Sequence, residues 1–191
     1  MSEESNKRRA ETLENSNELD VEWVNGIQHF GPSPSPEHNS VLTNLTIDIG
    51  TYLRRKQCKL YTDRTDLILK KPTDALTADE LKKPVVPDLF IFCHKNFVKV
   101  GNNIVGVPDF ILEVLSPGSR KKDLVEKKSF YLEVGVKEYW VVDYLEKEVT
   151  KFFEGEVVIY TFDELIKVEI FEDFEIDFEW IRKELSESEG N

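Results

Sequence analysis

Apolar residues follow two different spacings along the chain. Between Glu37 and Lys56 they recur every three or four positions, which is the spacing of one face of an amphipathic helix. From Cys58 onward they form short runs bounded by turn residues, which is typical of strands. The chain therefore predicts one long helix followed by a sheet, with strands in runs 58–61, 67–69, 85–93, 106–116 and 137–143.

Turn residues divide the rest of the chain. Asn25-Gly26 predicts a small strand pair near the N-terminus, and residues 94–103 read as a long hairpin connection. After the last of these strands, further short strands are expected around Glu154-Gly155, with a brief helix near 163–166. A second helix is expected from Ser119 to Val134, because a proline-glycine pair precedes it and Gly135 follows it.

A length of 191 residues with 40% hydrophobic residues is enough for one domain of ordinary size. We expect a polar segment over 1–20, a single domain over 21–181 and an acidic tail over 182–191. No apolar stretch approaches the roughly 20 residues of a membrane-spanning helix, and the polar N-terminus does not resemble a signal peptide. The sequence therefore predicts a cytoplasmic protein without a membrane segment. Cys58 and Cys93 are expected to be reduced thiols in the core.

The net charge of −12 is unevenly distributed. Residues 163–191 contain eleven acidic and three basic residues, and residues 1–22 contain seven acidic and three basic residues. The body of the chain, 23–162, is therefore neutral. Because the acidity lies at the two ends, the total charge neither supports nor excludes a polyanionic partner.

A carboxylate interrupts each of two apolar strands. Asp88 and Glu113 stand among Leu, Phe, Ile and Val, where an ionised carboxylate is costly unless it is paired or binds a metal. Asp109 shares a face with Glu113 but lies about 13 Å away along the strand, too far to bind the same ion. On an adjacent strand about 4.8 Å away, Asp88 can meet Glu113 and form an oxygen site suited to Mg²⁺ or Mn²⁺. The alternative is structural: both aspartates follow a proline at the start of a strand, and Glu113 pairs with a lysine.

An ordered series of short motifs covers residues 22–143. It begins with Glu22-x3-Gly26 and Pro34-Ser-Pro36-Glu-His38 and continues with Val86-Pro-Asp88-Leu-Phe-Ile. It ends with Gly106-Val-Pro-Asp-Phe-Ile-Leu-Glu113-Val-Leu-Ser116-Pro, Asp123-x3-Lys127-x3-Tyr131 and Gly135-Val-Lys-Glu-Tyr-Trp140-Val-Val-Asp143. The series resembles the Uma-type (DUF820-like) restriction endonucleases of the PD-(D/E)XK nuclease superfamily.

This resemblance implies an α/β (α+β) fold with a restriction-endonuclease-like core, a mixed sheet flanked by helices. It also implies that Asp88 and Glu113 bind a divalent ion. The superfamily usually places a lysine two residues after the glutamate, where this chain has Leu115. The resembled family takes its lysine from the following helix, and Lys127 matches that position.

The spacing of Asp123, Lys127 and Tyr131 places the three residues in one stripe of that helix. A lysine in this stripe can approach the metal site and orient a water or neutralise charge in the transition state. Lys122 and Lys128 compete with Lys127 for the role, and an ordinary Asp–Lys surface pair is the structural alternative.

Other residues complete the candidate site. The Val114 carbonyl is a candidate third metal ligand, and Glu37, His38, Asp109 and Asp123 are further candidates. Positive charge at the start of a helix opposes the helix dipole, so the basic group there favours contact with phosphates. That group comprises Arg120, Lys121, Lys122 and Lys128.

The sequence thus predicts a Mg²⁺- or Mn²⁺-dependent nuclease that hydrolyses phosphodiester bonds, with DNA as substrate and a homo-oligomer, a dimer, as the assembly. The ion would lower the pKa of a bound water and polarise the scissile phosphate. The alternative is a catalytically silent nuclease-fold protein that acts as an oligomeric interaction or nucleic-acid-binding module. Leu115 and the acidic C-terminal segment favour this alternative.

Overall fold

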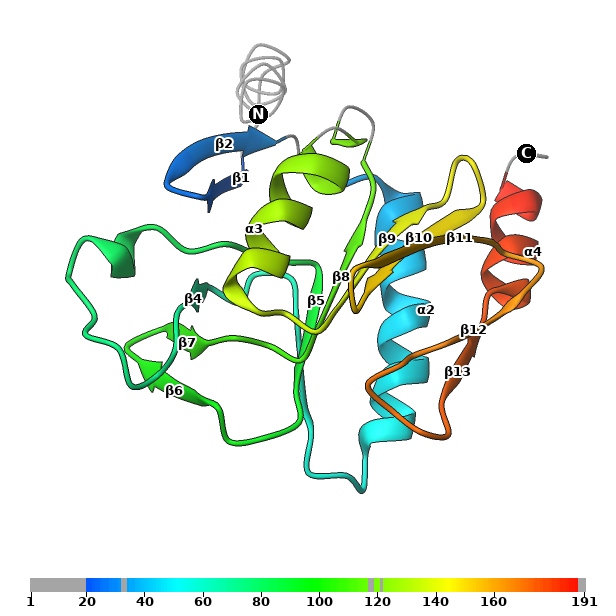
Figure 1. Ribbon diagram of the computed structural model, residues 1–191. Coiled ribbons are helices and arrows are strands. Elements are labelled where there is room, and N and C mark those ends of the chain that lie inside the picture. Colours follow the sequence, from blue (N-terminus) through cyan, green and yellow to red (C-terminus); the bar gives the residue numbers. More distant parts are fainter. Residues whose placement is uncertain (1–19, 32–33, 117–118, 121, 189–191) are drawn as a thin grey trace, which may run out of the picture.

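The computed structural model describes residues 20–31, 34–116, 119–120 and 122–188. A central sheet lies between helices, and a smaller sheet extends from one side of it (Figure 1). The helices are α2 (Pro36–Leu53), α3 (Lys128–Val134) and α4 (Glu179–Ser188), with a 3₁₀ turn η1 (Glu80–Lys82) and a π-helical turn η2 (Lys122–Lys127). The strands are β1 (Asp20–Val24), β2 (Ile27–Gly31), β3 (Lys59–Thr62), β4 (Leu67–Leu69), β5 (Leu89–Phe92), β6 (Phe97–Val100), β7 (Asn103–Gly106), β8 (Phe110–Val114), β9 (Glu138–Asp143), β10 (Glu148–Phe153), β11 (Glu156–Thr161), β12 (Leu165–Lys167) and β13 (Glu175–Asp177).

The central sheet has six strands in the order β11-β10-β9-β8-β5-β3. Strands β8 and β9 are parallel and every other neighbouring pair is antiparallel, so the sheet is mixed, as expected. The parallel pair needs a crossover connection, and η2 with α3 provides it. This connection places η2 beside the end of β8, where Glu113 lies.

Both faces of the sheet are covered, which is why β8 is buried along its whole length. On one face, Leu112 and Val114 pack with α2 and α4 in a single apolar cluster. On the other, Ile111 and Leu115 pack with Tyr131 of α3. Two apolar clusters on opposite faces of one sheet confirm the mixed α/β (α+β) class.

Helix α2 begins at Pro36, one residue before the start that the apolar spacing predicts. Ser35 is the N-cap and its hydroxyl accepts a hydrogen bond from the backbone N–H of His38, while Pro36 occupies the first helical turn. Leu45 and Ile49 are fully buried against the sheet. The capped start fixes His38 at the end of the sheet that carries Asp88.

Several sequence expectations need correction. The brief helix expected at 163–166 is wrong, because β12 covers part of it and pairs with β13. The connection at 94–103 contains β6 and the turn of the β6–β7 hairpin, and this hairpin forms a second sheet with β4. The helix after Ser119 exists, but its first part is the π-helical turn η2. Gly135 follows it with a left-handed backbone (φ 101°), as predicted.

Helix α4 crosses the expected boundary between domain and tail at 181/182. Leu185 is buried in the cluster that contains α2, so part of the acidic C-terminal segment packs on the domain. Residues 1–19 of the expected polar segment lie outside the described residues. In the described part of the chain, no helix combines the length and apolarity needed to cross a membrane.

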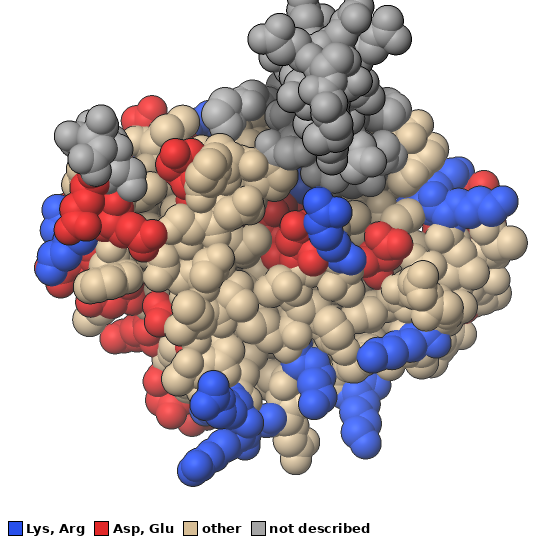
Figure 2. All heavy atoms as spheres, turned by 180° about the vertical axis from the view of Figure 1, so that it is seen from behind, with Lys and Arg blue, Asp and Glu red and all other residues tan. Residues whose placement is uncertain are grey.

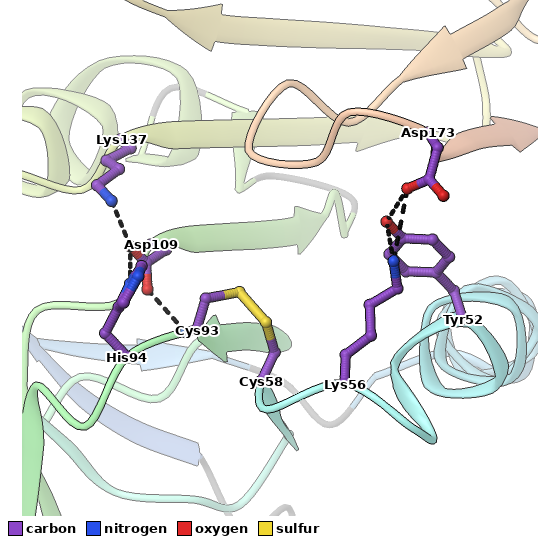
Figure 3. The surroundings of a disulfide bond; sticks show 8 residues. All are labelled: Tyr52, Lys56, Cys58, Cys93, His94, Asp109, Lys137 and Asp173. Carbon is purple, nitrogen blue, oxygen red and sulfur yellow. Dashed lines mark hydrogen bonds and ion pairs between the residues drawn. A yellow bond between two sulfur atoms is a disulfide. The ribbon is translucent and has the colours of Figure 1, made fainter.

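The expectation that Cys58 and Cys93 are reduced core thiols is wrong in this structure, since they form a disulfide (Figure 3). The register of β3 and β5 pairs Lys59 with Phe92, so the two cysteines lie opposite each other one position further along. Both are partly exposed rather than buried. Pairing across 35 residues is a property of strand register, which the sequence alone does not reveal.

Candidate functional site

Asp88 lies directly before β5, at the end of the sheet where β8 ends. The β5–β8 register pairs Leu89 with Leu112, so the next position brings Asp88 opposite Glu113. Oδ2 of Asp88 accepts a hydrogen bond from the backbone N–H of Val114 at 2.7 Å. The sheet register therefore places the two residues at opposite positions on adjacent strands.

Glu113 is buried, with 3% of its surface exposed. Its Oε1 accepts hydrogen bonds from Nζ of Lys127 and from the hydroxyl of Tyr131, both at 2.9 Å. Leu115, two residues later, packs in the apolar cluster with Tyr131. Strand β8 has no lysine two residues after Glu113. Instead, Lys127 of the following element contacts this glutamate.

The expected stripe of Asp123, Lys127 and Tyr131 faces this glutamate. Nζ of Lys127 lies 3.4 Å from Oδ1 of Asp123, and both side chains are 4% exposed. Burial, followed by the charges of Glu113 and Asp123, raises the pKa of Tyr139 well above its ordinary value. A buried lysine between two buried carboxylates is the arrangement that compensates the desolvation of all three groups.

Helix α2 covers the face of the sheet opposite to α3, and its His38 approaches Asp88 from there. Its Nε2 lies 3.2 Å from Oδ2 of Asp88. Burial opposes protonation of the ring, but hydrogen bonding to Asp88 and the charge of that carboxylate outweigh it, so the pKa of His38 is raised. The Nδ1 atom is buried and has no hydrogen-bond partner among the described residues. His38, a further candidate of the sequence, therefore lies beside Asp88.

Other sequence candidates lie elsewhere or have other partners. Asp109 is at the opposite end of β8, where it accepts hydrogen bonds from Nζ of Lys137 and the backbone N–H of Cys93 (Figure 3). The side chain of Glu37 is exposed, and hydrogen bonds from its own backbone N–H and from Ser35 lower its pKa. Asp109 is therefore not brought to Asp88 and Glu113, and the described contacts of Glu37 are local to the start of α2.

The expected basic group is only partly assembled near the site. Arg120 forms an ion pair with Asp143 at the end of β9. The ammonium of Lys128 lies 5.4 Å from the centroid of the Phe152 ring, and Lys122 is partly exposed. Lys121 lies outside the described residues. In the view from behind, Asp and Glu gather mainly on the side that carries α4, with Lys and Arg along the lower margin (Figure 2).

Tyr131 is the functional candidate that the sequence named only as part of a stripe. It is fully buried and donates to the same oxygen as Lys127. Its spacing of four residues from Lys127 is the signal that could have identified it. A phenol and an ammonium on one carboxylate oxygen fix the orientation of Glu113.

Comparison with known protein families identifies the family of this chain. A family model described as "Uma2: Putative restriction endonuclease" matches residues 8–179, which is most of the chain. This chain belongs to the Uma2 family. No curated protein matches it.

A solved structure has the Uma2 chain's fold. It is a crystal structure titled as a putative nuclease belonging to DUF820 from Anabaena variabilis, with a TM-score of 0.67 and 17% sequence identity. The match covers 91% of this chain and 96% of the other. At this identity the likeness establishes the fold, a nuclease-type core.

Restriction-endonuclease-like proteins generally use divalent metals, which prefer oxygen ligands such as carboxylates. Among the described residues, no group of three His, Cys, Asp or Glu side chains is placed to hold a metal. Mg²⁺ binds through one or two carboxylates and keeps several waters, so Asp88 and Glu113 fit it without a third such side chain. The ring of His38 lies beside Asp88 through Nε2, and its buried Nδ1 has no hydrogen-bond partner in the described chain.

Proposed function

We propose that this Uma2 protein is a divalent-metal-dependent endonuclease that hydrolyses phosphodiester bonds, with DNA as its substrate. One observation carries the proposal: Lys127 contacts Glu113, while Glu113 occupies the sheet position opposite Asp88. Two carboxylates and one lysine on neighbouring elements form the minimal set for metal-assisted phosphodiester hydrolysis. Membership of the Uma2 family supports the same reaction.

Asp88 and Glu113 would hold Mg²⁺ or Mn²⁺, with the Val114 carbonyl as a third ligand. When bound, such an ion supplies Lewis-acid stabilisation of a phosphoryl oxygen and a more acidic water. The Val114 N–H and His38 hold the Asp88 carboxylate from two directions. These contacts orient Asp88 before any ligand arrives, which reduces the cost of organising the site.

Lys127 has a separate role in the proposal. Its ammonium lies beside Glu113 and Asp123. In the proposal, a scissile phosphate bound at the metal would lie close to this charge. Held there, the ammonium orients the attacking water and neutralises the charge that forms in the transition state. Tyr131 acts as a positioning residue, because its contact is with Glu113.

Binding of the flanking phosphates is assigned to the basic residues at the start of this helical segment. Arg120, Lys122 and Lys128 belong to this group, as does Lys121 outside the described residues. Phosphate contacts of this kind carry no base specificity and weaken with salt. Cleavage of both DNA strands needs two such sites, which is consistent with the proposed homodimer.

The direct test is a cleavage assay on the full chain. Plasmid DNA and a single-stranded RNA are incubated with Mg²⁺ or Mn²⁺, and a doubly substituted protein, Asp88→Asn with Glu113→Gln, is purified in parallel to exclude contaminating nucleases. We expect the unsubstituted protein to nick or linearise the plasmid and the double variant to leave it intact. Equal activity of both preparations would refute the site, and cleavage of RNA alone would change the substrate.

One observation favours the alternative of a catalytically silent module. Lys127 already pairs with two buried carboxylates, an arrangement that also serves fold stability alone. A protein of this kind would bind nucleic acid or a partner without cleaving it. In the same assay, binding of DNA by the unsubstituted protein without any cleavage in Mg²⁺ or Mn²⁺ would select this alternative.

A further inference from the structure

Strand β11 forms one edge of the central sheet (Figure 1). It pairs with β10 through a tight turn at Glu154 and Gly155, both of which have positive φ. In the described part of the chain, no strand pairs with its other side. An open edge of this kind presents unpaired N–H and C=O groups to another strand.

The side chains of β11 lack the usual protection of an edge. Its centre is Val157, Val158 and Ile159, which are 53%, 41% and 60% exposed. The strand contains no Lys, Arg or Pro, and its one charged residue, Glu156, stands at its first position beside the turn. By contrast, the edge strand β6 of the smaller sheet has an exposed lysine, Lys99, at its centre. Charged side chains and proline keep edge strands from pairing with other strands. The centre of β11 has neither, so it is open to pairing with another strand.

Backbone hydrogen bonds show which groups of β11 face outward. The N–H of Phe162, just after β11, donates to the carbonyl of Lys147. The backbone N–H and C=O groups of the even-numbered residues of β11 therefore point toward β10, and those of the odd-numbered residues point away from it. The N–H of Thr161 instead donates to Glu164, and its carbonyl accepts from the Glu164 N–H, which closes the outward groups of Thr161 within the chain. The N–H and C=O groups of Val157 and Ile159 point the same way as those of Thr161.

We propose that β11 pairs antiparallel with β11 of a second copy of this chain, across a two-fold axis at Val158, to form a continuous twelve-stranded sheet. The axis is perpendicular to the sheet, so Val158 faces Val158 of the second copy. Val157 of each copy then lies opposite Ile159 of the other. The two symmetry-related Val157–Ile159 pairs use the four outward N–H and C=O groups of each strand that are not bonded to Glu164.

Charges agree with this register. Glu156 of one copy lies opposite Tyr160 of the other, and Tyr160 has the ammonium of its own Lys151 at 4.9 Å from its ring centroid. The acidic residue thus faces an aromatic ring, and the ammonium beside that ring already pairs with Glu169 of its own chain. No two like charges are opposed along the strand, and Val157 faces Ile159 on the other side of the sheet. The same patch of both copies is used, as a two-fold dimer requires.

Sedimentation velocity on the full chain tests the interface through two substitutions. Val158→Glu places two carboxylates opposite each other at the axis but lies beside Lys151 within its own chain, so the monomer keeps its fold. Ile159→Pro removes an outward N–H and leaves the ladder to β10 intact. Val98→Glu is the matched control, since Val98 is 44% exposed on the other sheet.

We expect a dimer for the unsubstituted protein and for Val98→Glu, and monomers for Val158→Glu and Ile159→Pro with unchanged circular dichroism. In hydrogen exchange, the amides of Val157 and Ile159 should be protected in the dimer and exchange rapidly in the Val158→Glu monomer. A monomeric unsubstituted protein in the micromolar range, or dimers of all four proteins, would overturn the interface. A monomer with protected Val157 and Ile159 amides would do the same, because another segment of the chain would then cover β11. None of these outcomes depends on nuclease activity.

Discussion

Lys127 donates a hydrogen bond to Oε1 of Glu113 at 2.9 Å, although the two residues belong to different layers of the fold. The strand supplies the carboxylate, and the crossover segment that follows it supplies the ammonium. In the proposed function, Lys127 serves in place of a lysine two residues after Glu113, a position where Leu115 packs into the core. Substitution of Lys127 should therefore affect both the rate of cleavage and the free energy of unfolding, and the two effects can be measured separately.

Lys127→Met should reduce DNA cleavage by at least about a hundredfold, the scale of losing one transition-state donor. Mn²⁺ affinity should stay within a few-fold of that of the unsubstituted protein, because Lys127 is not a ligand. The substitution also leaves Glu113 and Asp123 without their shared cation, so the free energy of unfolding should fall by about 3–5 kcal/mol. Rates are measured in single turnover, well below the unfolding temperature.

Lys128→Met provides the comparison for that experiment. Lys128 is partly exposed beside Phe152. Its substitution should weaken DNA binding and reduce the salt dependence of binding, while single-turnover cleavage of bound DNA persists. Full cleavage by Lys127→Met together with inactivity of Lys128→Met would transfer the catalytic role to Lys128.

The metal site is tested by titration calorimetry with Mn²⁺. Asp88→Asn and Glu113→Gln should each weaken binding by at least about tenfold, because an amide oxygen is a poorer ligand than a carboxylate for a hard cation. Asp109→Asn is the matched control, since Asp109 lies at the other end of β8 and pairs with Lys137. Unchanged affinity in both site variants, or an equal loss in the control, would contradict the assignment.

The disulfide between Cys58 and Cys93 should stabilise the oxidised protein. Closing a loop across 35 residues contributes about 3–4 kcal/mol, which corresponds to roughly 10 °C in the unfolding temperature of a domain of this size. Dithiothreitol should lower the unfolding temperature of the unsubstituted protein by that amount. A variant with Cys58→Ser and Cys93→Ser should be insensitive to the reductant. No response in the unsubstituted protein would mean that its thiols are reduced.

Glu80 should make stability depend on acid pH. A hydrogen bond from Lys70, followed by those from Thr77, lowers the pKa of Glu80 to about 2. A depressed folded-state pKa stabilises the protein above the ordinary value of 4.5, and this stabilisation is lost as the pH falls toward about 2. Glu80→Gln should therefore be less stable than the unsubstituted protein at pH 7, and the difference should shrink between pH 4.5 and 3.

Urea unfolding at several pH values measures that difference. Glu133→Gln, on the exposed side of α3, removes the same charge without those hydrogen bonds and serves as its control. A difference between Glu80→Gln and the unsubstituted protein that is independent of pH would refute the linkage.

The sequence by itself determined the local structure and the chemical types of the site. Helical spacing located α2, alternating and continuous apolar runs located β5, β8 and β9, and the turn dipeptides located two hairpins. Carboxylates in apolar strands identified Asp88 and Glu113, because burying an isolated charge is costly and such a position needs a reason. Four-residue spacing placed Lys127 in one stripe with Asp123 and Tyr131, while its choice over Lys122 and Lys128 rested on the family resemblance. Apart from that resemblance, all of these signals act over a few neighbouring residues.

Tertiary structure alone decided which distant residues meet. The disulfide and the opposition of Asp88 to Glu113 both follow from strand register, which is set by packing between segments far apart in the chain. The position of His38 beside Asp88 depends on how α2 crosses the sheet, and its spacing carries no trace of that contact. The helix expected at 163–166 became β12 because pairing with β13 outweighed local preference. Local patterns specify elements, whereas partners are selected by the packing of the whole domain.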